Sequence, residues 1–242
     1  MTWSILARDP SGAFGVAIAS RFFGVGVLCP HVESGVGALS TQALVNPLYA
    51  RTGMRLLAQG TPPAEIVRML TAADAGRDHR QLHMIDVQGR IAAHTGSACI
   101  EWCGHLAGDH YSIAGNMLVG SAVLSETAAA YERAVTLSFA ERLLAALDAG
   151  EAAGGDKRGR QAAALLIFTT EEYPFLDLRV DDHEDPLREL RRLHDKSLER
   201  FQPFVGCLPA RARPAGITDR AVIEEEVARF QVERGRGAAK TP

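Results

Sequence analysis

The stretch TWSILARDPSGAFGVAIAS, residues 2–20, decides the fold. Its apolar, β-favouring halves TWSILAR and GAFGVAIAS are joined by the turn formers of DPSG. The alternating series Trp3, Ile5 and Ala7 is typical of a strand with one buried face. The sequence therefore predicts an antiparallel hairpin whose first strand begins at Thr2, although chain ends are usually loose unless something holds them.

Beyond this hairpin, blocks of strands alternate with pairs of helices. Paired helices do not fit the single alternation of a parallel βαβ sheet, and they favour two antiparallel sheets with helices outside. Thr61 is the expected N-cap of one helix, and Gly89 the turn of a second hairpin. We expect strands over 36–43, 81–87, 90–96, 110–120, 162–170 and 175–182, and helices over 48–60, 61–75, 125–135, 139–150 and 185–201.

Size and composition indicate a globular protein. The chain has 242 residues, of which 47% are hydrophobic and 23% charged. The composition changes near Pro209, so we expect one domain over residues 1–208, and a charged helix with a loose tail over 209–242. The predicted fold class is α+β, a four-layer αββα sandwich of two mainly antiparallel sheets.

Charge and hydropathy exclude some classes of partner. The net charge is −3 with both signs interspersed, so no basic face for nucleic acid is expected. No apolar run approaches the length of a membrane span, and no signal-peptide pattern is visible. We therefore expect a cytoplasmic protein that acts on a small molecule, without a nucleic-acid or membrane partner. The paired surface helices are compatible with a homodimer.

The cysteines do not form a metal-binding pattern. Cys99 and Cys103 lie near His94, His105 and His110 in the sequence, but the spacing fits no standard zinc motif. A cytoplasmic protein would keep such thiols reduced. We expect no metal and no cofactor.

Seven ordered blocks of the chain resemble one protein family. They are MTWSILARDP, GVAIASRFFGVG, GVGALSTQALVNP, AAHTGSACIEWCGH, GNMLVG, GGDKRGRQ and DLRVDDHEDP. The family is known as domain of unknown function 1028, and the blocks cover nearly all of residues 1 to about 195. It is similar in fold to the N-terminal-nucleophile (Ntn) hydrolases, so the resemblance implies an αββα sandwich. Fold alone does not carry an activity.

Thr2 is the candidate nucleophile that this resemblance suggests. If Met1 is removed, Thr2 gains an α-amine with an ordinary pKa of about 7.7–8.0, part of which is neutral in the cell. That amine can take the hydroxyl proton, directly or through a water, and so activate the hydroxyl for attack on an amide carbonyl. The alternative is that Thr2 is a β-favouring residue at an ordinary strand start.

Residues at neighbouring strand ends are candidates to assist Thr2. Arg21 is a candidate catalytic cation that would lower the pKa of the amine and stabilise negative charge. Asn116 is a candidate catalytic hydrogen-bond donor, with a turn role as its alternative. Ser20, in the same block as Arg21, is a candidate substrate-binding residue or an ordinary residue entering a loop.

Polar residues that close the third predicted strand are candidates for binding the substrate. Thr41, Gln42 and Asn46 can orient a substrate amide or contribute to an oxyanion hole. Asn46 precedes Pro47 and is equally suited to a turn or a helix cap.

Two polar loops complete the predicted site. Asp156, Arg158 and Gln161 in GGDKRGRQ are candidate substrate-binding residues, with a solvated charge run as the alternative. Asp182 and His183 in RVDDHEDP are also candidates, for binding, acid–base work or the polar frame of a turn. Asp185 is the expected N-cap of the helix after Pro186.

Two functions of different class follow from these residues. The leading hypothesis is an Ntn-type amidohydrolase that cleaves a small amide, peptide or ureide-like substrate with Thr2. The rival is a non-catalytic Ntn-like domain that binds a small metabolite or a protein partner. A metal-dependent hydrolase that uses His183 ranks third.

Overall fold

The computed structural model describes residues 2–238, with side chains up to residue 235. Met1, on whose removal the nucleophile hypothesis depends, and the end of the expected C-terminal tail lie outside the described residues. The described residues form two compact units, divided between Leu190 and Arg191. The expected domain boundary between residues 208 and 209 stays a prediction.

The first unit is built on the hairpin at the start of the chain. β1 (Thr2–Arg8) and β2 (Phe14–Ser20) pair antiparallel over their whole length, from Thr2 opposite Ser20 to Arg8 opposite Phe14. They occupy the centre of a six-stranded antiparallel sheet with the order β10-β9-β2-β1-β8-β7. The remaining strands are β7 (Trp102–Gly108), β8 (Tyr111–Leu118), β9 (Ala162–Phe168) and β10 (Leu176–Val180).

A second, four-stranded antiparallel sheet has the order β3-β4-β5-β6. Its central pair aligns Ser40 with His83 and Gln42 with Gln81. Polar residues thus occupy alternate positions on both central strands. The strands are β3 (Pro30–Glu33), β4 (Gly37–Ala43), β5 (Arg80–Asp86) and β6 (Ile91–Thr95).

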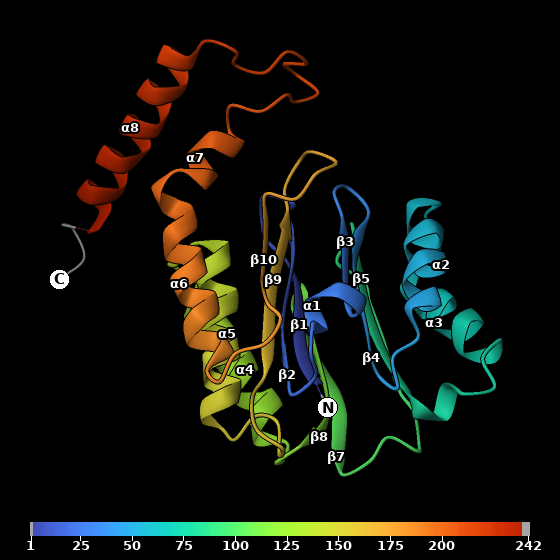
Figure 1. Cartoon of the computed structure of the whole chain (residues 1–242). Helices are drawn as coiled ribbons and strands as arrows, with labels where there is room; N and C mark the ends of the chain where they lie inside the picture. The colour runs from blue at the N-terminus through green and yellow to red at the C-terminus, as the bar shows by residue number, and fades with distance from the viewer. Residues whose placement is uncertain (1, 239–242) are drawn as a thin grey trace. The chain divides into compact units, whose positions relative to one another are not determined.

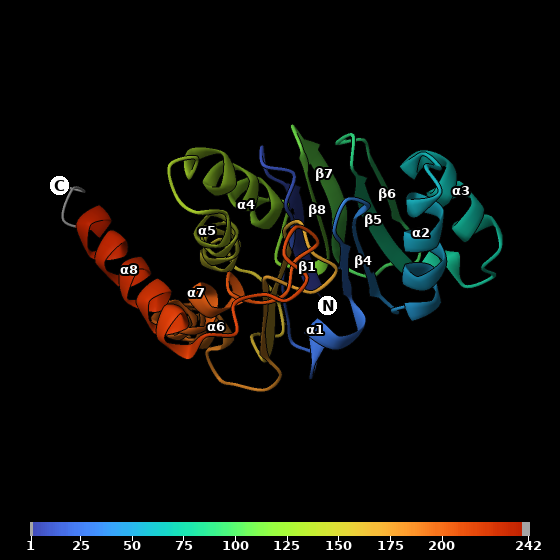
Figure 2. The ribbon, with the colours of Figure 1, turned by 90° about the horizontal axis from the view of Figure 1, so that it is seen from above.

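Helices cover the outer face of each sheet. In Figures 1 and 2, α2 and α3 lie outside the four-stranded sheet, and α4 and α5 lie outside the six-stranded sheet. The predicted four-layer αββα sandwich is therefore confirmed. The bounds of these helices are α2 (Pro47–Ala58), α3 (Pro63–Ala72), α4 (Ala122–Arg133) and α5 (Phe139–Ala152).

The alternation along β1 determines what each side chain contacts. Trp3 faces α5, where a Cβ on Gly150 would lie only 2.7 Å from Trp3 Nε1, so a larger residue does not fit there without a shift. Leu6 points the other way and packs between the sheets with Phe14, Val16, Ala38 and Ile85. The even-numbered residues of β1, including Thr2, therefore belong to the layer between the two sheets.

Three details differ from the sequence expectations. The glycine-spaced segment after β2 contains a short helix, α1 (Val25–Leu28), as well as β3. β7 was not predicted, because its half-buried sequence WCGHLAG lacks a strong apolar alternation. α3 begins at Pro63 after the N-cap Pro62, so Thr61 does not cap it. A single 3-10 turn, η1 (Arg77–His79), precedes β5.

The second unit consists of helices and their connections. α6 (Pro186–Glu199) crosses the division between the units and is followed by α7 (Phe201–Val205) and α8 (Arg220–Ala238), the expected charged helix. The Arg200 guanidinium binds both carboxylate oxygens of Glu224, at 2.6 and 2.8 Å. Neither α8 nor any other helix within residues 2–238 is long and apolar enough to cross a bilayer.

Candidate functional site

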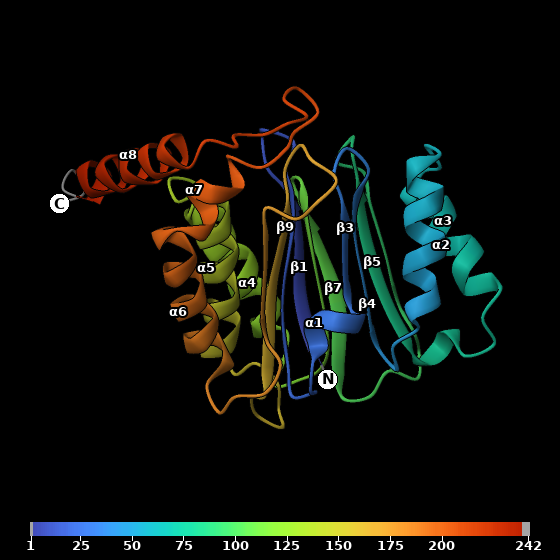
Figure 3. The ribbon, with the colours of Figure 1, turned by 45° about the horizontal axis from the view of Figure 1, so that its top comes forward.

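The end of the sandwich at which β1 begins collects polar residues from three adjacent strands. Thr2 pairs with Ser20 on one side and with Asn116 on the other. It is only 5% exposed, and its Oγ1 lies 3.1 Å from Ser20 Oγ, at hydrogen-bond distance. Figure 3 shows α1 at this same end of the sheets. The strand pairing thus holds the Thr2 hydroxyl against that of Ser20.

Side-chain amides from both sheets lie against the main-chain carbonyl of Thr2. Gln42 Nε2 and Asn116 Nδ2 are each 3.4 Å from Thr2 O. Both amides also donate to Gln81 Oε1, at 2.7 Å from Gln42 and 3.0 Å from Asn116. Gln81 in turn donates to the Gly115 carbonyl at 2.8 Å. In this arrangement Gln42 and Asn116 position Thr2 itself.

A fully buried histidine extends this network between the sheets. Ser4 Oγ donates to Gln42 Oε1 at 2.7 Å and lies 2.8 Å from His83 Nε2. Because the Ser4 proton is used on Gln42, the network assigns a hydrogen to His83 Nε2, which donates to Ser4. His83 Nδ1 then accepts from Ser112 Oγ at 3.0 Å. The hydrogen bond from Ser112 requires an unprotonated Nδ1, and thus a neutral imidazole.

Burial, and to a lesser extent the nearby His105, lowers the pKa of His83 to about 3. In the unfolded chain a histidine has a pKa of about 6.5, so below that pH only the unfolded state gains a proton. The free energy of unfolding should therefore fall as the pH drops from about 6.5 towards 3, by at most about 1.4 kcal/mol per pH unit from this group.

Urea unfolding of the wild-type protein and of His83→Gln, from pH 7 to pH 4, measures this contribution. The glutamine does not titrate and retains one donor and one acceptor, so its stability should vary less with pH. The same pH dependence in both proteins would show that His83 is not the source.

A pocket of about 340 Å³ opens beside Thr2. One wall of the pocket contains Thr2, and the opposite wall comes from the four-stranded sheet. This opposite wall includes Arg80, at the first position of β5. Arg80 Nη1 donates to the Leu44 carbonyl at 2.7 Å. Ala43 has a φ of 68°, a left-handed conformation that is uncommon for a residue with a side chain. The lining residues are Thr2, Phe22, Cys29, Gln42, Ala43, Leu44, Val45 and Arg80.

Asp74 holds the segment that forms this wall. Its Oδ2 accepts from Tyr49 Oη at 2.8 Å, from Asn46 Nδ2 at 3.1 Å and from Arg80 Nε at 3.1 Å. Its Oδ1 accepts from the main-chain N–H of Gly76 at 2.7 Å. The Tyr49 hydroxyl, followed by the other donors, holds the pKa of Asp74 far below its usual range. The carboxylate thus stays charged and ties α2, β5 and the pocket wall together.

Replacing Asp74 by alanine should destabilise the protein by about 2–3 kcal/mol, because the charged hydrogen bonds to Tyr49 and Arg80 are lost together. Chemical denaturation of Asp74→Ala gives the value. Asp78→Ala is the matched control, since Asp78 is exposed and close in sequence, and a change within about 0.5 kcal/mol is expected there. Equal effects of the two substitutions would contradict this role of Asp74.

Arg21, Asp156 and Arg158 lie together next to the end of β2. Asp156 is buried and accepts from the main-chain N–H groups of Arg21 and Arg158, both at 2.8 Å. The exposed Arg21 side chain donates to the Arg158 carbonyl at 2.6 Å, and Arg158 Nη2 donates back to the Arg21 carbonyl at 3.1 Å. The Arg21 guanidinium is thus directed at the loop that carries Asp156.

Gln161, Asp182 and His183 form a separate group, in which Gln161 is half-buried and the other two residues are exposed. Gln161 Nε2 donates to Asp182 Oδ1 at 3.1 Å, and the His183 main-chain N–H donates to the Gln161 carbonyl at 2.8 Å. His183 Nδ1 accepts from the main-chain N–H of Asp185 at 2.9 Å. Asp185 Oδ1 accepts from the N–H of Arg188 at 3.3 Å, as expected of the residue that caps α6.

Thr41 and Asn46 build the turn from β4 into α2. Thr41 Oγ1 donates to the Asn46 carbonyl at 3.3 Å. Asn46 is the N-cap of α2, and its Oδ1 accepts from the main-chain N–H of Leu48 at 3.1 Å. Of the predicted residues, the structure therefore brings Thr2, Ser20, Gln42 and Asn116 into direct contact, with Thr41 and Asn46 behind the pocket wall.

Four residues of this site were missed at the sequence level: Ser4, Arg80, Gln81 and His83. Arg80 lies just outside the strand predicted over residues 81–87. A pattern in the sequence could have identified Ser4, Gln81 and His83: polar side chains recur at every second position of three strands. These positions are 2 and 4 in β1, 40 and 42 in β4, and 81 and 83 in β5.

The cysteines are free thiols. Burial raises the pKa of Cys29, in the pocket wall, to about 12, so it stays protonated. Cys103 Sγ donates to the Cys99 carbonyl at 3.6 Å, and burial raises the pKa of both thiols. Among residues 2–238 no three His, Cys, Asp or Glu side chains gather closely enough to hold a metal ion.

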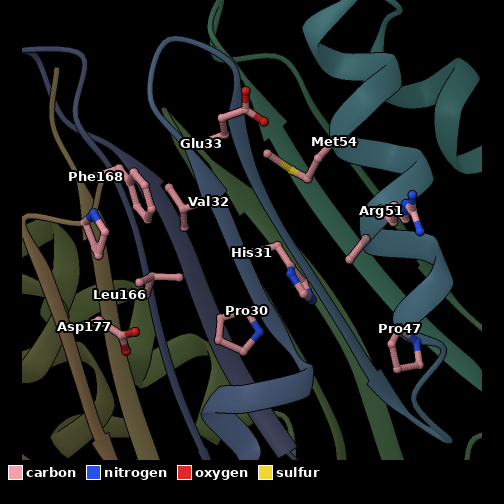
Figure 4. A pocket seen from close by; sticks show the side chains of 12 residues that line it. Pro30, His31, Val32, Glu33, Pro47, Arg51, Met54, Leu166, Phe168 and Asp177 are labelled. Carbon is pink, nitrogen blue, oxygen red and sulfur yellow. The ribbon is translucent and has the colours of Figure 1, made fainter. Parts of the chain in front are cut away.

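Another pocket, of about 520 Å³, lies away from these residues. Figure 4 shows its walls: His31 and Glu33 from β3, Arg51 from α2, Phe168 from β9 and Asp177 from β10. None of the residues predicted as site residues lines it. The polar residues around Thr2 therefore mark the smaller pocket as the candidate site.

Comparisons with known proteins support the family resemblance. A family model described as "Family of unknown function (DUF1028)" matches residues 2–190. The crystal structure of a member of that family from Silicibacter pomeroyi has 32% sequence identity and a TM-score of 0.83, with 90% of this chain and 99% of that chain covered. Anbu (ancestral beta-subunit) from Yersinia bercovieri aligns at 14% identity and a TM-score of 0.41, covering 86% of this chain and 98% of that chain. No curated protein matches.

Proposed function

This chain belongs to the DUF1028 family, and from that premise and the geometry around Thr2 we propose that it is an N-terminal-nucleophile amidohydrolase. Its substrate is a small amide or peptide that binds in the pocket beside Thr2. The observation that supports this proposal most directly is the position of Thr2. It is the first residue of β1 and lies between Ser20 and a pocket of about 340 Å³.

The chemistry requires a free α-amine on Thr2, and thus cleavage of the bond between Met1 and Thr2. The neutral amine takes the Oγ1 proton while Oγ1 forms a bond to the substrate carbonyl carbon, and the carbonyl π electrons move to oxygen. As the tetrahedral intermediate collapses, the C–N bond breaks and the leaving amine takes a proton from the α-ammonium. Water then hydrolyses the acyl ester, with the amine again acting as base.

The neighbours of Thr2 have positioning and electrostatic roles in this proposal. Ser20 Oγ, at 3.1 Å, orients the hydroxyl and can share its proton. Gln42 and Asn116 bind the Thr2 carbonyl and so help to hold the start of β1, which carries the α-amine. Arg80 lies in the pocket wall, where Asp74 and the Leu44 carbonyl hold its guanidinium, so its role is to shape the pocket.

Arg21 supplies a positive charge near the end of β2. The loop that carries Asp156 and Arg158 holds Arg21 in place. Gln161, Asp182 and His183 are proposed to shape the approach of the substrate.

The test compares two forms of one protein. A fusion that carries a cleavable domain directly before Thr2 is assayed on short peptides, acyl amides and carbamoyl amino acids, before and after proteolytic release. Intact mass confirms that Thr2 is the first residue. We expect turnover only after release. Equal turnover before release would exclude the amine as the base, and binding without turnover in either form would indicate a binding domain.

A further inference from the structure

The pocket beside Thr2 has a mainly apolar wall. Five of its eight lining residues have apolar side chains: Phe22, Cys29, Ala43, Leu44 and Val45. Val45 also packs against the buried cluster of Ile18, Val25, Cys29, Ala162 and Ala164, which anchors that side of the pocket. Its volume of about 340 Å³ is at the lower end of the range for small-molecule sites.

The polar groups of the pocket already have partners within the protein. The Gln42 amide donates to Gln81 at 2.7 Å and accepts from Ser4 at 2.7 Å. The Arg80 guanidinium is bound through Nε to Asp74 at 3.1 Å and through Nη1 to the Leu44 carbonyl. The charge of Arg80 is thus compensated by a carboxylate, and a second carboxylate on a ligand would compete with Asp74.

Two large apolar side chains of the wall are left in contact with water. Phe22 is 49% exposed and Leu44 is 61% exposed, although both line a concave surface. Covering apolar surface of this kind is favourable in proportion to its area. A ligand with an apolar group removes that surface from water, whereas a charged or ureide group leaves its own polar atoms to be desolvated.

We propose that this pocket selects an uncharged, apolar group, so that the substrate class is an amide that carries an aliphatic or aromatic group next to the scissile carbonyl. The inference rests on the proposed function for the place of the carbonyl at Thr2. It excludes ureide-like and carboxylate-bearing groups from this subsite. Phe22 and Leu44 determine the specificity.

The experiment measures binding to Thr2→Ala, which retains the pocket and cannot turn over its ligand through Thr2. Acetamide, butyramide and hexanamide are titrated, followed by the Leu44 and Val45 methyl resonances. We expect the affinity to rise about fourfold for each methylene that is buried, which corresponds to about 0.8 kcal/mol. N-carbamoylglycine and succinamate should bind more weakly than hexanamide.

Phe22→Ala, in the same background, should weaken hexanamide binding about fivefold or more. Phe23→Ala is the matched control, because Phe23 is adjacent and 66% exposed but does not line the pocket, and it should leave the affinity unchanged. Absence of a chain-length trend, tighter binding of succinamate, or equal effects of the two phenylalanine substitutions would each overturn the proposal. Because binding is measured without turnover, these results are independent of whether Thr2 is a nucleophile.

Discussion

Thr2→Ala should lower turnover about 10³-fold or more, while the protein remains folded. Removal of a nucleophile has effects of this order in other hydrolases. The substitution isolates the hydroxyl, because alanine is also small enough for Met1 to be removed and leaves a free α-amine. The lost contact with Ser20 should reduce the free energy of unfolding by about 1 kcal/mol.

Two further variants and a folding control make this result specific. Thr2→Ser, which loses only a methyl group, should retain activity within about tenfold of the wild type. Thr61→Ala, a threonine substitution outside the site, should leave turnover unchanged. Circular dichroism establishes that each variant is folded. Turnover by Thr2→Ala at the wild-type rate would end the nucleophile hypothesis, whatever the N-terminal mass.

His83→Ala should destabilise the protein by about 3–5 kcal/mol, equivalent to a fall in Tm of about 10 °C for a protein of this size. The imidazole is fully buried and bonded to Ser4 at 2.8 Å and to Ser112 at 3.0 Å. Its removal leaves a cavity between the sheets and deprives both hydroxyls of a partner.

The matched control is His79→Ala, four positions earlier in the chain, where the histidine side chain is exposed. Its effect should stay within about 0.5 kcal/mol. Calorimetry or urea unfolding at pH 7 measures both variants. If His83→Ala were as stable as His79→Ala, the hydrogen bonds between the sheets would contribute nothing to stability.

The sequence predicted the layers of the fold well because they depend on local patterns. The alternation of Trp3, Ile5 and Ala7, and the turn residues of DPSG, are sufficient for the β1–β2 hairpin. The structure confirms both pairs of helices and both sheets. β7 was missed because its half-exposed sequence has little alternation, and α1 and β3 were missed because each spans only four residues.

The site was less predictable, because it forms from strands far apart in the sequence. Gln42 and Gln81 meet Asn116 only after two sheets are stacked, and no local pattern in a single sequence shows which sheets stack. Arg80 precedes the predicted strand, and its place in the pocket wall depends on contacts with Asp74 and the Leu44 carbonyl that no local pattern shows. Family blocks identified Thr2 and Ser20, which are neighbours in one hairpin.

The layer between the sheets is divided in two: apolar around Leu6 and Phe14, polar around Ser4, His83 and Gln81. Apolar contacts tolerate sliding, but hydrogen bonds between fixed positions do not. If one sheet were shifted over the other, several buried donors and acceptors would lose their partners. Each group left without a partner costs about 1–3 kcal/mol of stability. A misaligned sandwich is therefore less stable than the native one. Thr2 and Arg80 come from opposite sheets. The alignment that satisfies the hydrogen bonds between the sheets therefore also places the two walls of the pocket opposite each other.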